Sequence, residues 1–412
     1  MKIFVLTILL SIFFISCGKE SPFVKKSVEP GIELVENVPV ETNLGDSTLR
    51  NAQEAWIEMI SGAKNNIDIE QYYILSKPGE PMQIVLDSII KAGERGVKVR
   101  ILCDARMYNT YPDAMNMLSP KKNIECRVIS FGGLAGGIQH SKLIIADSSV
   151  VFIGSQNFDW RSLKHNHEIG LLIKGNEIAG SYRDIFEHDW KFAAKNDEYV
   201  PFLNTNVMLK SYTFISKQND SVTIVPTFSP PGLIPVAANW DEKQIVRMIY
   251  NSKESILMQF QTYNPEANDK SYYSAIDSAL IIAAKRGIKV RLIVSDWSIG
   301  EPEITYLKNL SSHPNIEVKY SSVPDAKEGY IPFARVEHCN YIVSDSLACW
   351  IGTSIAEKSY FYNSRDLGAL VYNKKISVQL YNIFMLDWNS NYTRQIKPTG
   401  EYKVREHEEK TP

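Results

Sequence analysis

The sequence repeats itself at a distance of just under two hundred residues, and this repetition constrains the fold more than any other feature. Residues 95–100 (RGVKVR) return as residues 286–291 (RGIKVR), at an offset of 191, and Asp189 returns as Asp387 at an offset of 198. Such an internal repeat indicates two copies of one structural unit. Each copy would span roughly 180 residues, an ordinary size for a domain.

Helical and strand patterns alternate within each copy. This alternation predicts an α/β fold of two pseudo-symmetric lobes, each a mixed, mostly parallel sheet flanked by helices, with a site where the lobes meet. The expected lobes are residues 46–205 and 206–400, followed by a charged tail at 401–412. In the first lobe we expect helices at 51–62, 82–95 and 178–193, strands at 66–74, 97–103, 125–130 and 169–173, and a hairpin between the last two strands.

The most informative local motif begins at His140, with Lys142 two residues later and Asp147 beyond a run of β-rich residues. Side chains alternate across a strand, so His140 and Lys142 should project from the same face. A His-x-Lys pair with a later Asp also occurs by chance, and alone it would carry no function. Further polar side chains follow at the next strand ends and make chance a poor explanation: Ser155, Asn157 and Glu168.

The second copy carries an altered version of this motif. His338 and Asp345 are kept, but Asn340 stands in the place of Lys142, and Ile355 in the place of Asn157. One positive charge and one amide are therefore missing from that side of the predicted site. A neutral hydrogen bond is worth roughly half of a charge-assisted one, so we expect weakened activity or binding alone. Arg335, Lys358 and Arg365 could substitute for the charge, although solvated or structural roles are the simpler interpretation.

Other histidines and cysteines have simpler explanations. A lone histidine in a strand is more often structural than catalytic, which is the interpretation for His165, His167, His188 and His313. No C-x-x-C or H-x-x-x-H spacing occurs, so the sequence predicts no metal site and no cofactor. Strand alternation points Cys339 away from the His338 face. For the cysteines, buried free thiols and a disulfide between Cys103 and Cys126 both stay open.

Several longer segments together resemble the phospholipase D superfamily, and within it the phospholipase D3/D4 branch. The resemblance spans residues 32–392, and its more specific parts are residues 154–163, 332–338, 351–354 and 387–390. Members of that branch act as lysosomal 5′-exonucleases on single-stranded nucleic acid. The resemblance implies phosphodiester cleavage without metal, in two steps through a phosphohistidine.

The resemblance also implies a role for each matching residue. His140 would attack phosphorus, while His338 would protonate the leaving oxygen and later activate water. The other implied catalytic residues are Lys142, Glu168 and Asp147, and the implied substrate-binding residues are Ser155, Asn157, Asn340, Asp345, Asp366 and Thr353. Within these sets, Glu168 and Asp366 would orient the imidazoles. Asp147 and Asp345 rank lowest because hairpin aspartates commonly brace the turn.

Charge and aromatic content limit the substrate class without deciding it. The formal net charge of −2 gives no argument for a globally basic nucleic-acid binder. A narrow cationic cleft lined by Lys142, Arg161 and Arg335 stays compatible with it. Nearby aromatics could stack bases or simply fill the core: Phe158, Trp160, Tyr360, Phe361 and Tyr362. The partner is thus a phosphodiester, with single-stranded nucleic-acid ends preferred; the alternatives are a phospholipid hydrolase or transphosphatidylase and a phosphate-binding pseudoenzyme.

The first residues predict export from the cytoplasm. A short basic start, an apolar stretch over residues 3–15 and Cys17 resemble a bacterial lipoprotein signal, with acylation of Cys17 and a tether over residues 18–45. The apolar stretch is too short for an ordinary transmembrane helix. We therefore expect a lipid-anchored protein in the periplasm or at the outer membrane, with a cleaved secretory signal as the alternative. Part of this tether could pack as an edge strand.

Overall fold

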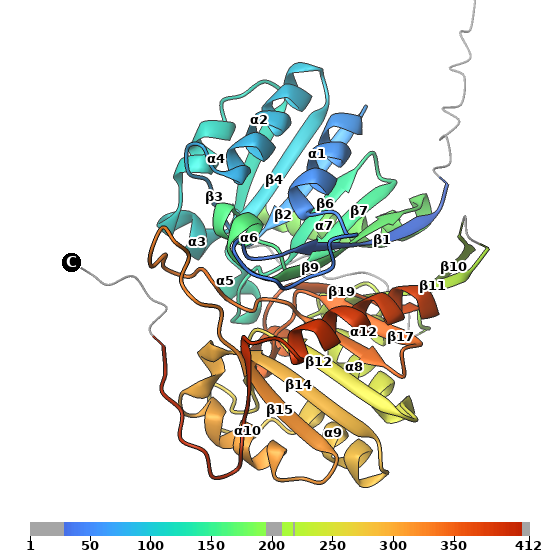
Figure 1. The fold of residues 1–412 in the computed structure, drawn as a ribbon. Helices are drawn as coiled ribbons and strands as arrows, with labels where there is room; N and C mark the ends of the chain where they lie inside the picture. The colour runs from blue at the N-terminus through green and yellow to red at the C-terminus, as the bar shows by residue number, and fades with distance from the viewer. Residues whose placement is uncertain (1–28, 195–207, 217–218, 406–412) are drawn as a thin grey trace, which may run out of the picture.

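The computed structural model describes residues 29–194, 208–216 and 219–405, which form two lobes stacked one above the other (Figure 1). The N-terminal lobe is blue to green and the C-terminal lobe is yellow to red. The predicted division into two pseudo-symmetric α/β lobes is confirmed by two sheets that repeat the same order of equivalent strands.

The N-terminal lobe is built on a seven-stranded sheet in the order β1-β9-β7-β6-β2-β4-β5. The expected elements are found within a few residues of their predicted ends. The elements of this lobe are β1 Gly31–Asn37, α1 Ala52–Gly62, β2 Asn66–Gln71, β3 Ile74–Leu75, α2 Pro81–Glu94, β4 Lys98–Asp104, α3 Ala105–Thr110, α4 Asp113–Leu118, β5 Ile124–Ile129, α5 Phe131–Ala135, β6 Lys142–Ala146, β7 Val150–Gly154, β8 Phe158–Asp159, α6 Trp160–Lys164, β9 Glu168–Lys174 and α7 Asn176–Ala194.

The C-terminal lobe repeats this plan with extra edge strands, in the order β10-β11-β19-β17-β16-β12-β14-β15-β20. Its elements are β10 Tyr212–Ile215, β11 Ser221–Ser229, η1 Ala237–Asn239, α8 Asp241–Asn251, β12 Ser255–Phe260, β13 Tyr263–Asn264, α9 Ala275–Lys285, β14 Lys289–Ser295, η2 Asp296–Ile299, α10 Glu303–Ser311, β15 Ile316–Ser321, β16 Tyr341–Ser344, β17 Ala348–Gly352, β18 Ala356–Glu357, α11 Lys358–Tyr362, β19 Asp366–Tyr372, α12 Lys374–Trp388 and β20 Thr393–Gln395.

Both sheets are mixed, but the expected predominance of parallel pairing is wrong. In the N-terminal sheet only β2–β4 and β4–β5 pair in parallel, while the other neighbours are antiparallel. The reason is that the β6–β7 hairpin lies inside the sheet, and the strands that follow it in the sheet order continue its antiparallel pairing. Within the two large sheets, parallel pairing is confined to strands joined through a helical crossover.

Each hairpin turns through an aspartate that also anchors it. Ala146 and Val150 pair across a three-residue loop, in which Asp147 and Ser148 have left-handed φ values of 50° and 51°. The Asp147 carboxylate accepts hydrogen bonds from the backbone N–H groups of residues 64, 65 and 66 at 2.7–3.1 Å. Asp345 repeats this arrangement with the N–H groups of residues 253, 254 and 255. These aspartates therefore tie each hairpin to the start of the neighbouring strand.

A continuous hydrophobic core joins the two lobes. It includes buried side chains from β6, β7, β9 and α7 of the first lobe and from β11, β16, β17, β19 and α12 of the second. Separate cores lie on the outer face of each sheet, under α1 and α2 in one lobe and under α8 and α9 in the other. Because α7 and α12 pack at the contact between the lobes, the lobes form one rigid unit around their shared face (Figure 1).

The structure bears on the predictions for the tether, for the two ends of the chain and for the cysteines. Residues 31–37 of the expected tether form β1, an edge strand paired with β9, as the sequence allowed. Cys17 and the predicted signal lie outside the described residues, and so does most of the tail. No helix in the described ranges is both long and apolar enough to span a bilayer. The four described cysteines are free thiols, which favours that alternative over a disulfide.

Candidate active site

The two motif histidines lie where the lobes meet, each just before a central strand. The His140 backbone N–H donates to the carbonyl of Arg365 at 2.9 Å, and the His338 N–H donates to the carbonyl of His167 at 2.9 Å. Both hydrogen bonds cross from one lobe to the other. The structure thus brings the two predicted imidazoles to one interface, and both side chains are at least nine-tenths buried.

Each imidazole is held by a carboxylate of the opposite lobe. His140 Nδ1 lies 3.0 Å from Asp366 Oδ1, at the start of β19. His338 Nδ1 lies 2.7 Å from Glu168 Oε2, at the start of β9. A carboxylate on Nδ1 fixes the tautomer and leaves Nε2 as the reacting nitrogen. The sequence identified the four residues but could not show that the pairs cross between lobes.

Lys142 completes the first half of the site. Its Nζ lies 2.8 Å from both His140 Nε2 and the His140 backbone oxygen, which confirms that the two side chains share a face. Burial lowers the pKa of Lys142 to about 7 and raises the pKa of Asp366 to about 7. Burial, together with the charge of Lys142, also lowers the pKa of His140 well below 6.5. His140 is therefore a neutral imidazole at neutral pH.

Ser155 and Thr353 support the carboxylates in this structure. Ser155 Oγ donates to Glu168 Oε2 at 2.6 Å, and Thr353 Oγ1 donates to Asp366 Oδ1 at 2.7 Å. Ser162, which the sequence analysis did not single out, donates to the other oxygen of Glu168. Hydrogen bonds to a carboxylate favour its ionised form. Direct contact of Ser155 and Thr353 with substrate stays a prediction.

The amide positions differ between the two halves. Asn157 Oδ1 is buried with no hydrogen-bond partner within the described ranges, and an amide flip would present its N–H there instead. Asn340 Oδ1 accepts from the backbone N–H of Gln261 at 3.2 Å, so its oxygen has a structural partner. Ile355, buried where the first lobe has Asn157, offers no polar group. The second half thus holds fewer donors than the first.

Asp147 and Asp345 are not brought to the imidazoles. Both carboxylates lie at the far ends of their hairpins and accept backbone N–H groups there. A role in catalysis for Asp147 or in substrate binding for Asp345 has no geometric support, because these oxygens are already occupied at the turns. This placement agrees with the expectation that both aspartates brace their turns.

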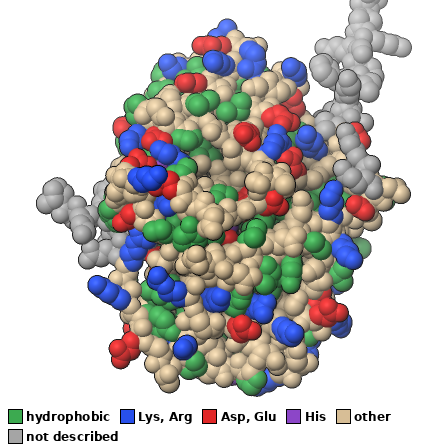
Figure 2. Space-filling view, viewed as in Figure 1, with side chains coloured by type: hydrophobic (Ala, Val, Ile, Leu, Met, Phe, Trp, Pro, Cys, Tyr) green, Lys and Arg blue, Asp and Glu red, His purple; other side chains and the backbone are tan. Residues whose placement is uncertain are grey.

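The arginines that were predicted to line a cationic cleft are bonded to other protein groups. Arg161 is paired with Asp159 at 2.7 Å, and Arg335 donates to the backbone oxygens of Val40 and Pro324. Arg365 forms a bidentate pair with Asp189, as described below. Figure 2 shows charged side chains of both signs interspersed over the face in view. Among these candidates, only Lys142 places its charge beside a catalytic imidazole.

Two tyrosines flank the first imidazole. The rings of Tyr72 and Tyr360 lie 5.2 Å and 4.8 Å from the His140 ring, both in edge contacts. Tyr360 was among the predicted aromatics, whereas Tyr72 was missed because it follows β2, far from the motif in sequence. Phe158 and Phe361 are fully buried in the cores, so they cannot stack on a substrate.

Comparison with known proteins gives matches over nearly the whole chain. The family model described as "Cardiolipin synthase, PLD-like domain" matches residues 56–190 and 245–388. Phospholipase D Z of Dictyostelium discoideum is 29% identical over 383 residues, which cover 88% of this chain and 90% of the relative. The 5′-3′ exonuclease PLD3 of Xenopus laevis is 28% identical, over 90% of this chain and 82% of the relative.

A solved structure supports the fold in the same way. The crystal structure of phosphatidylserine synthase from Haemophilus influenzae Rd KW20 superposes with a TM-score of 0.59 at 14% identity, and it covers 84% of this chain and 86% of its own. At that identity the likeness concerns the fold alone. Because the family model matches both lobes, and each match contains one of the two histidines, this chain belongs to the phospholipase D-like family.

Proposed function

We propose that this protein hydrolyses phosphodiesters in two steps, with His140 as nucleophile and His338 as general acid and then base. Membership of the phospholipase D-like family supports phosphodiester hydrolysis. The observation that carries the proposal is the crossed pairing, in which each imidazole is oriented by a carboxylate of the other lobe. Two oriented imidazoles at one interface are what an attack and a protonation require.

In the first step, Nε2 of His140 forms a bond to phosphorus while the P–O bond to the leaving group breaks. His140 suits this role because its lowered pKa keeps Nε2 without a proton. His338 gives its Nε2 proton to the leaving oxygen. In the second step, His338 takes a proton from water, which attacks phosphorus and releases His140. The negative charge of Glu168 stabilises His338 whenever it is protonated.

The phosphoryl oxygens need positive or hydrogen-bonding partners as charge develops on them. Lys142 and Asn157 supply these from the first lobe. In the second lobe only the amide of Asn340 is available at the matching place, since Ile355 is apolar. The site is therefore complete for nucleophilic attack and incomplete for charge stabilisation, which predicts slow turnover.

The preferred substrate is the end of a single-stranded nucleic acid. Relatives named 5′-3′ exonuclease support this choice, while relatives named phospholipase D support the phospholipid alternative. The rings of Tyr72 and Tyr360 beside His140 favour a substrate with flat bases. Both rings are also compatible with a packing role.

A direct assay separates the three candidate functions. The purified protein is incubated with 5′-hydroxyl single-stranded oligonucleotides and, separately, with phospholipid vesicles, with a chelator in the buffer. Release of nucleotides supports the proposal, and release of headgroups alone supports the phospholipase alternative. If neither substrate is turned over, and a His140→Ala variant behaves identically, the hydrolytic proposal is wrong and phosphate binding remains.

Restoring the missing charge should raise the rate. We expect Asn340→Lys to increase kcat/KM by at least about 10-fold, because loss of one such donor commonly costs about 10²- to 10³-fold. Asn340→Met is the matched control, since it has a similar length, lacks the charge and equally loses the Gln261 hydrogen bond. If Asn340→Lys is no faster than the wild type, the lost charge does not limit the rate.

Activity should fall as the pH rises through about 7. Lys142 is a cation below its lowered pKa of about 7 and neutral above it, so the free enzyme loses its phosphate-binding charge on the alkaline side. On the acidic side, the low pKa of His140 keeps the nucleophile neutral, while protonation of Asp366, whose pKa burial raises to about 7, should weaken the orientation of His140 and lower the rate there as well. A profile of kcat/KM from about pH 5 to about pH 9 tests this expectation.

The control for the pH profile is Lys142→Arg, whose guanidinium stays charged throughout that range. Its alkaline limb should move upward by more than about one pH unit if Lys142 is the titrating group. A wild-type profile that stays flat between about pH 6 and pH 8 would contradict the assignment.

A further inference from the structure

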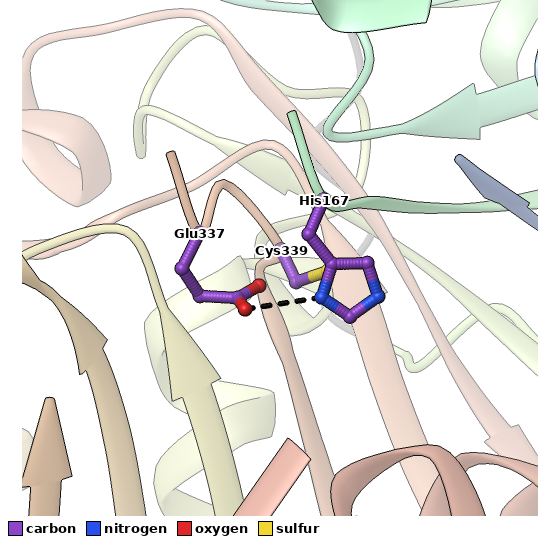
Figure 3. A group of neighbouring side chains, drawn as sticks. All are labelled: His167, Glu337 and Cys339. Carbon is purple, nitrogen blue, oxygen red and sulfur yellow. Dashed lines mark hydrogen bonds and ion pairs between the residues drawn. The ribbon is translucent and has the colours of Figure 1, made fainter. Parts of the chain in front are cut away.

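A second cluster of polar side chains lies buried between the lobes, next to the active site. Figure 3 shows the side chains of His167, Glu337 and Cys339 close together. His167 precedes β9, and Glu337 and Cys339 flank His338 in sequence. The three side chains are at most 1% exposed, and one ligand atom from each lies within 4.8 Å of the others. His167 belongs to the first lobe and the other two residues to the second, so the cluster bridges the interface.

Two further carboxylates surround the His167 ring. Nε2 lies 2.9 Å from Glu36 Oε1 on β1, while Nδ1 lies 3.0 Å from Glu337 Oε2 and 3.6 Å from Asp387 Oδ2 on α12. Without a metal, both ring nitrogens can donate to these carboxylates; a metal in place of the Nδ1 proton would keep the Nε2–H bond to Glu36 and direct the Nδ1 lone pair toward Glu337, Cys339 and Asp387. Metal-bound histidines typically donate their other N–H to a carboxylate in this way.

The charges in this cluster do not balance on their own. Three carboxylates face a single imidazole, and Glu337 Oε1 and Asp387 Oδ1 are buried without a hydrogen-bond partner among the residues that the structure describes. A buried carboxylate oxygen without a donor is costly. A divalent cation would satisfy the free oxygens and ionise the thiol.

The equivalent place in the other half of the molecule shows another way to neutralise a buried carboxylate. At an offset of 198, His167, Glu337 and Cys339 correspond to Arg365, Gln139 and Ser141. There, Arg365 forms a bidentate pair with Asp189, with Nε–Oδ2 and Nη2–Oδ1 distances of 2.6 Å and 2.9 Å. That half of the molecule has a permanent cation, and its three residues are poor metal ligands. The three corresponding residues of the cluster, a histidine, a glutamate and a cysteine, are good metal ligands.

We propose that His167 Nδ1, Glu337, Cys339 and Asp387 bind a structural zinc ion between the lobes. One nitrogen, one sulfur and carboxylate oxygens form an ordinary zinc ligand set. Ligand atoms around a tetrahedral zinc lie roughly 3.3–3.8 Å apart, close to the distances found between Nδ1 and the two carboxylates. Binding releases the Cys339 thiol proton and the proton between His167 Nδ1 and Glu337, and it leaves His167 as a neutral ligand that keeps its Nε2–H bond to Glu36.

Such an ion would act on the active site through its neighbours. Glu168 follows His167 in sequence, and His338 lies between Glu337 and Cys339. Fixing the ligands therefore fixes both members of the Glu168–His338 pair. The ion itself is shielded from the reacting phosphate, because Glu337 and Cys339 project from the strand face opposite to His338. This inference is independent of the proposed hydrolysis.

Metal analysis of the full-length protein tests the proposal. The protein is loaded with one equivalent of Zn²⁺ during refolding, passed over a desalting column and measured by plasma mass spectrometry. We expect about one zinc per chain. Replacing zinc with Co²⁺ should give a thiolate-to-cobalt charge-transfer band in the near ultraviolet, which reports on Cys339 directly. Neither measurement depends on turnover.

In the cluster variants, each ligand is replaced by the residue that stands at the equivalent position in the other half of the molecule. Cys339→Ser and Glu337→Gln should each lose most of the bound zinc, and Cys339→Ser should lose the cobalt band. Cys349→Ser is the matched control, because Cys349 is an equally buried thiol of the same lobe outside the cluster. Zinc content below about 0.2 per wild-type chain, or full retention in both cluster variants, overturns the proposal.

Discussion

His140→Ala is expected to reduce kcat by about 10⁴- to 10⁶-fold, the range found when a catalytic nucleophile or its base is removed. The methyl group of alanine cannot form the bond to phosphorus, and the Asp366 carboxylate then faces empty space. The measurement is turnover of whichever substrate the oligonucleotide and vesicle assay shows to be cleaved. His313→Ala is the control, since His313 lies beyond α10 and away from the site; it should leave kcat unchanged.

Because the two halves are nearly symmetric, His338 could be the nucleophile and His140 the acid. An experiment that traps the phosphohistidine decides between these two assignments. With a phosphodiester whose leaving group needs no protonation, such as a p-nitrophenyl ester, His338→Ala should still be phosphorylated but should not release the intermediate. Intact mass spectrometry should then show the adduct, and peptide mapping should place it on His140. An adduct on His338 in His140→Ala would reverse our assignment.

Asp189→Asn should lower the free energy of unfolding by about 3–5 kcal/mol, because it leaves a buried cation without its counter-charge. Arg365 and Asp189 are both fully buried, and their two hydrogen bonds join the residue before β19 of one lobe to α7 of the other. An amide keeps the shape of Asp189 but cannot neutralise the guanidinium. Urea unfolding, followed by tryptophan fluorescence, provides the measurement.

The control for this stability measurement lies on the same helix. Asp184→Asn removes an exposed carboxylate from α7 and should change the free energy of unfolding by less than about 0.5 kcal/mol. A loss below about 1 kcal/mol in Asp189→Asn would mean that water or another group compensates the Arg365 charge. In that case the ion pair would not be a main attachment between the lobes.

Local patterns in the sequence were sufficient for the elements and for the residues of the two imidazole pairs. The His140 hairpin could be predicted because strand alternation and turn residues act over a few positions. The repeat made His338 and Asp366 identifiable by their offset from the first copy. The parallel character of the sheets was overestimated, because chain order does not show that the hairpin strands lie inside the sheet.

What could not be predicted depends on contacts between the lobes. Whether Asp366 orients His140 or His338 is decided by how the halves pack, and no spacing along the chain encodes this choice. The same holds for the cluster of His167, Glu337 and Cys339, in which His167 lies 170 residues before Glu337. A search for metal motifs by spacing finds nothing there, because the ligands come together only when both sheets meet.

The crossed carboxylates have a consequence for the chain during its synthesis. When the first lobe has emerged and folded, it holds His140 and Lys142 but lacks Asp366, which is 226 residues further along. In the proposed mechanism, a chain that ends before β19 lacks the carboxylate that orients the nucleophile, so hydrolysis would require the last central strand to be in place. Topology would then provide the latency that many hydrolases obtain from a removable inhibitory segment.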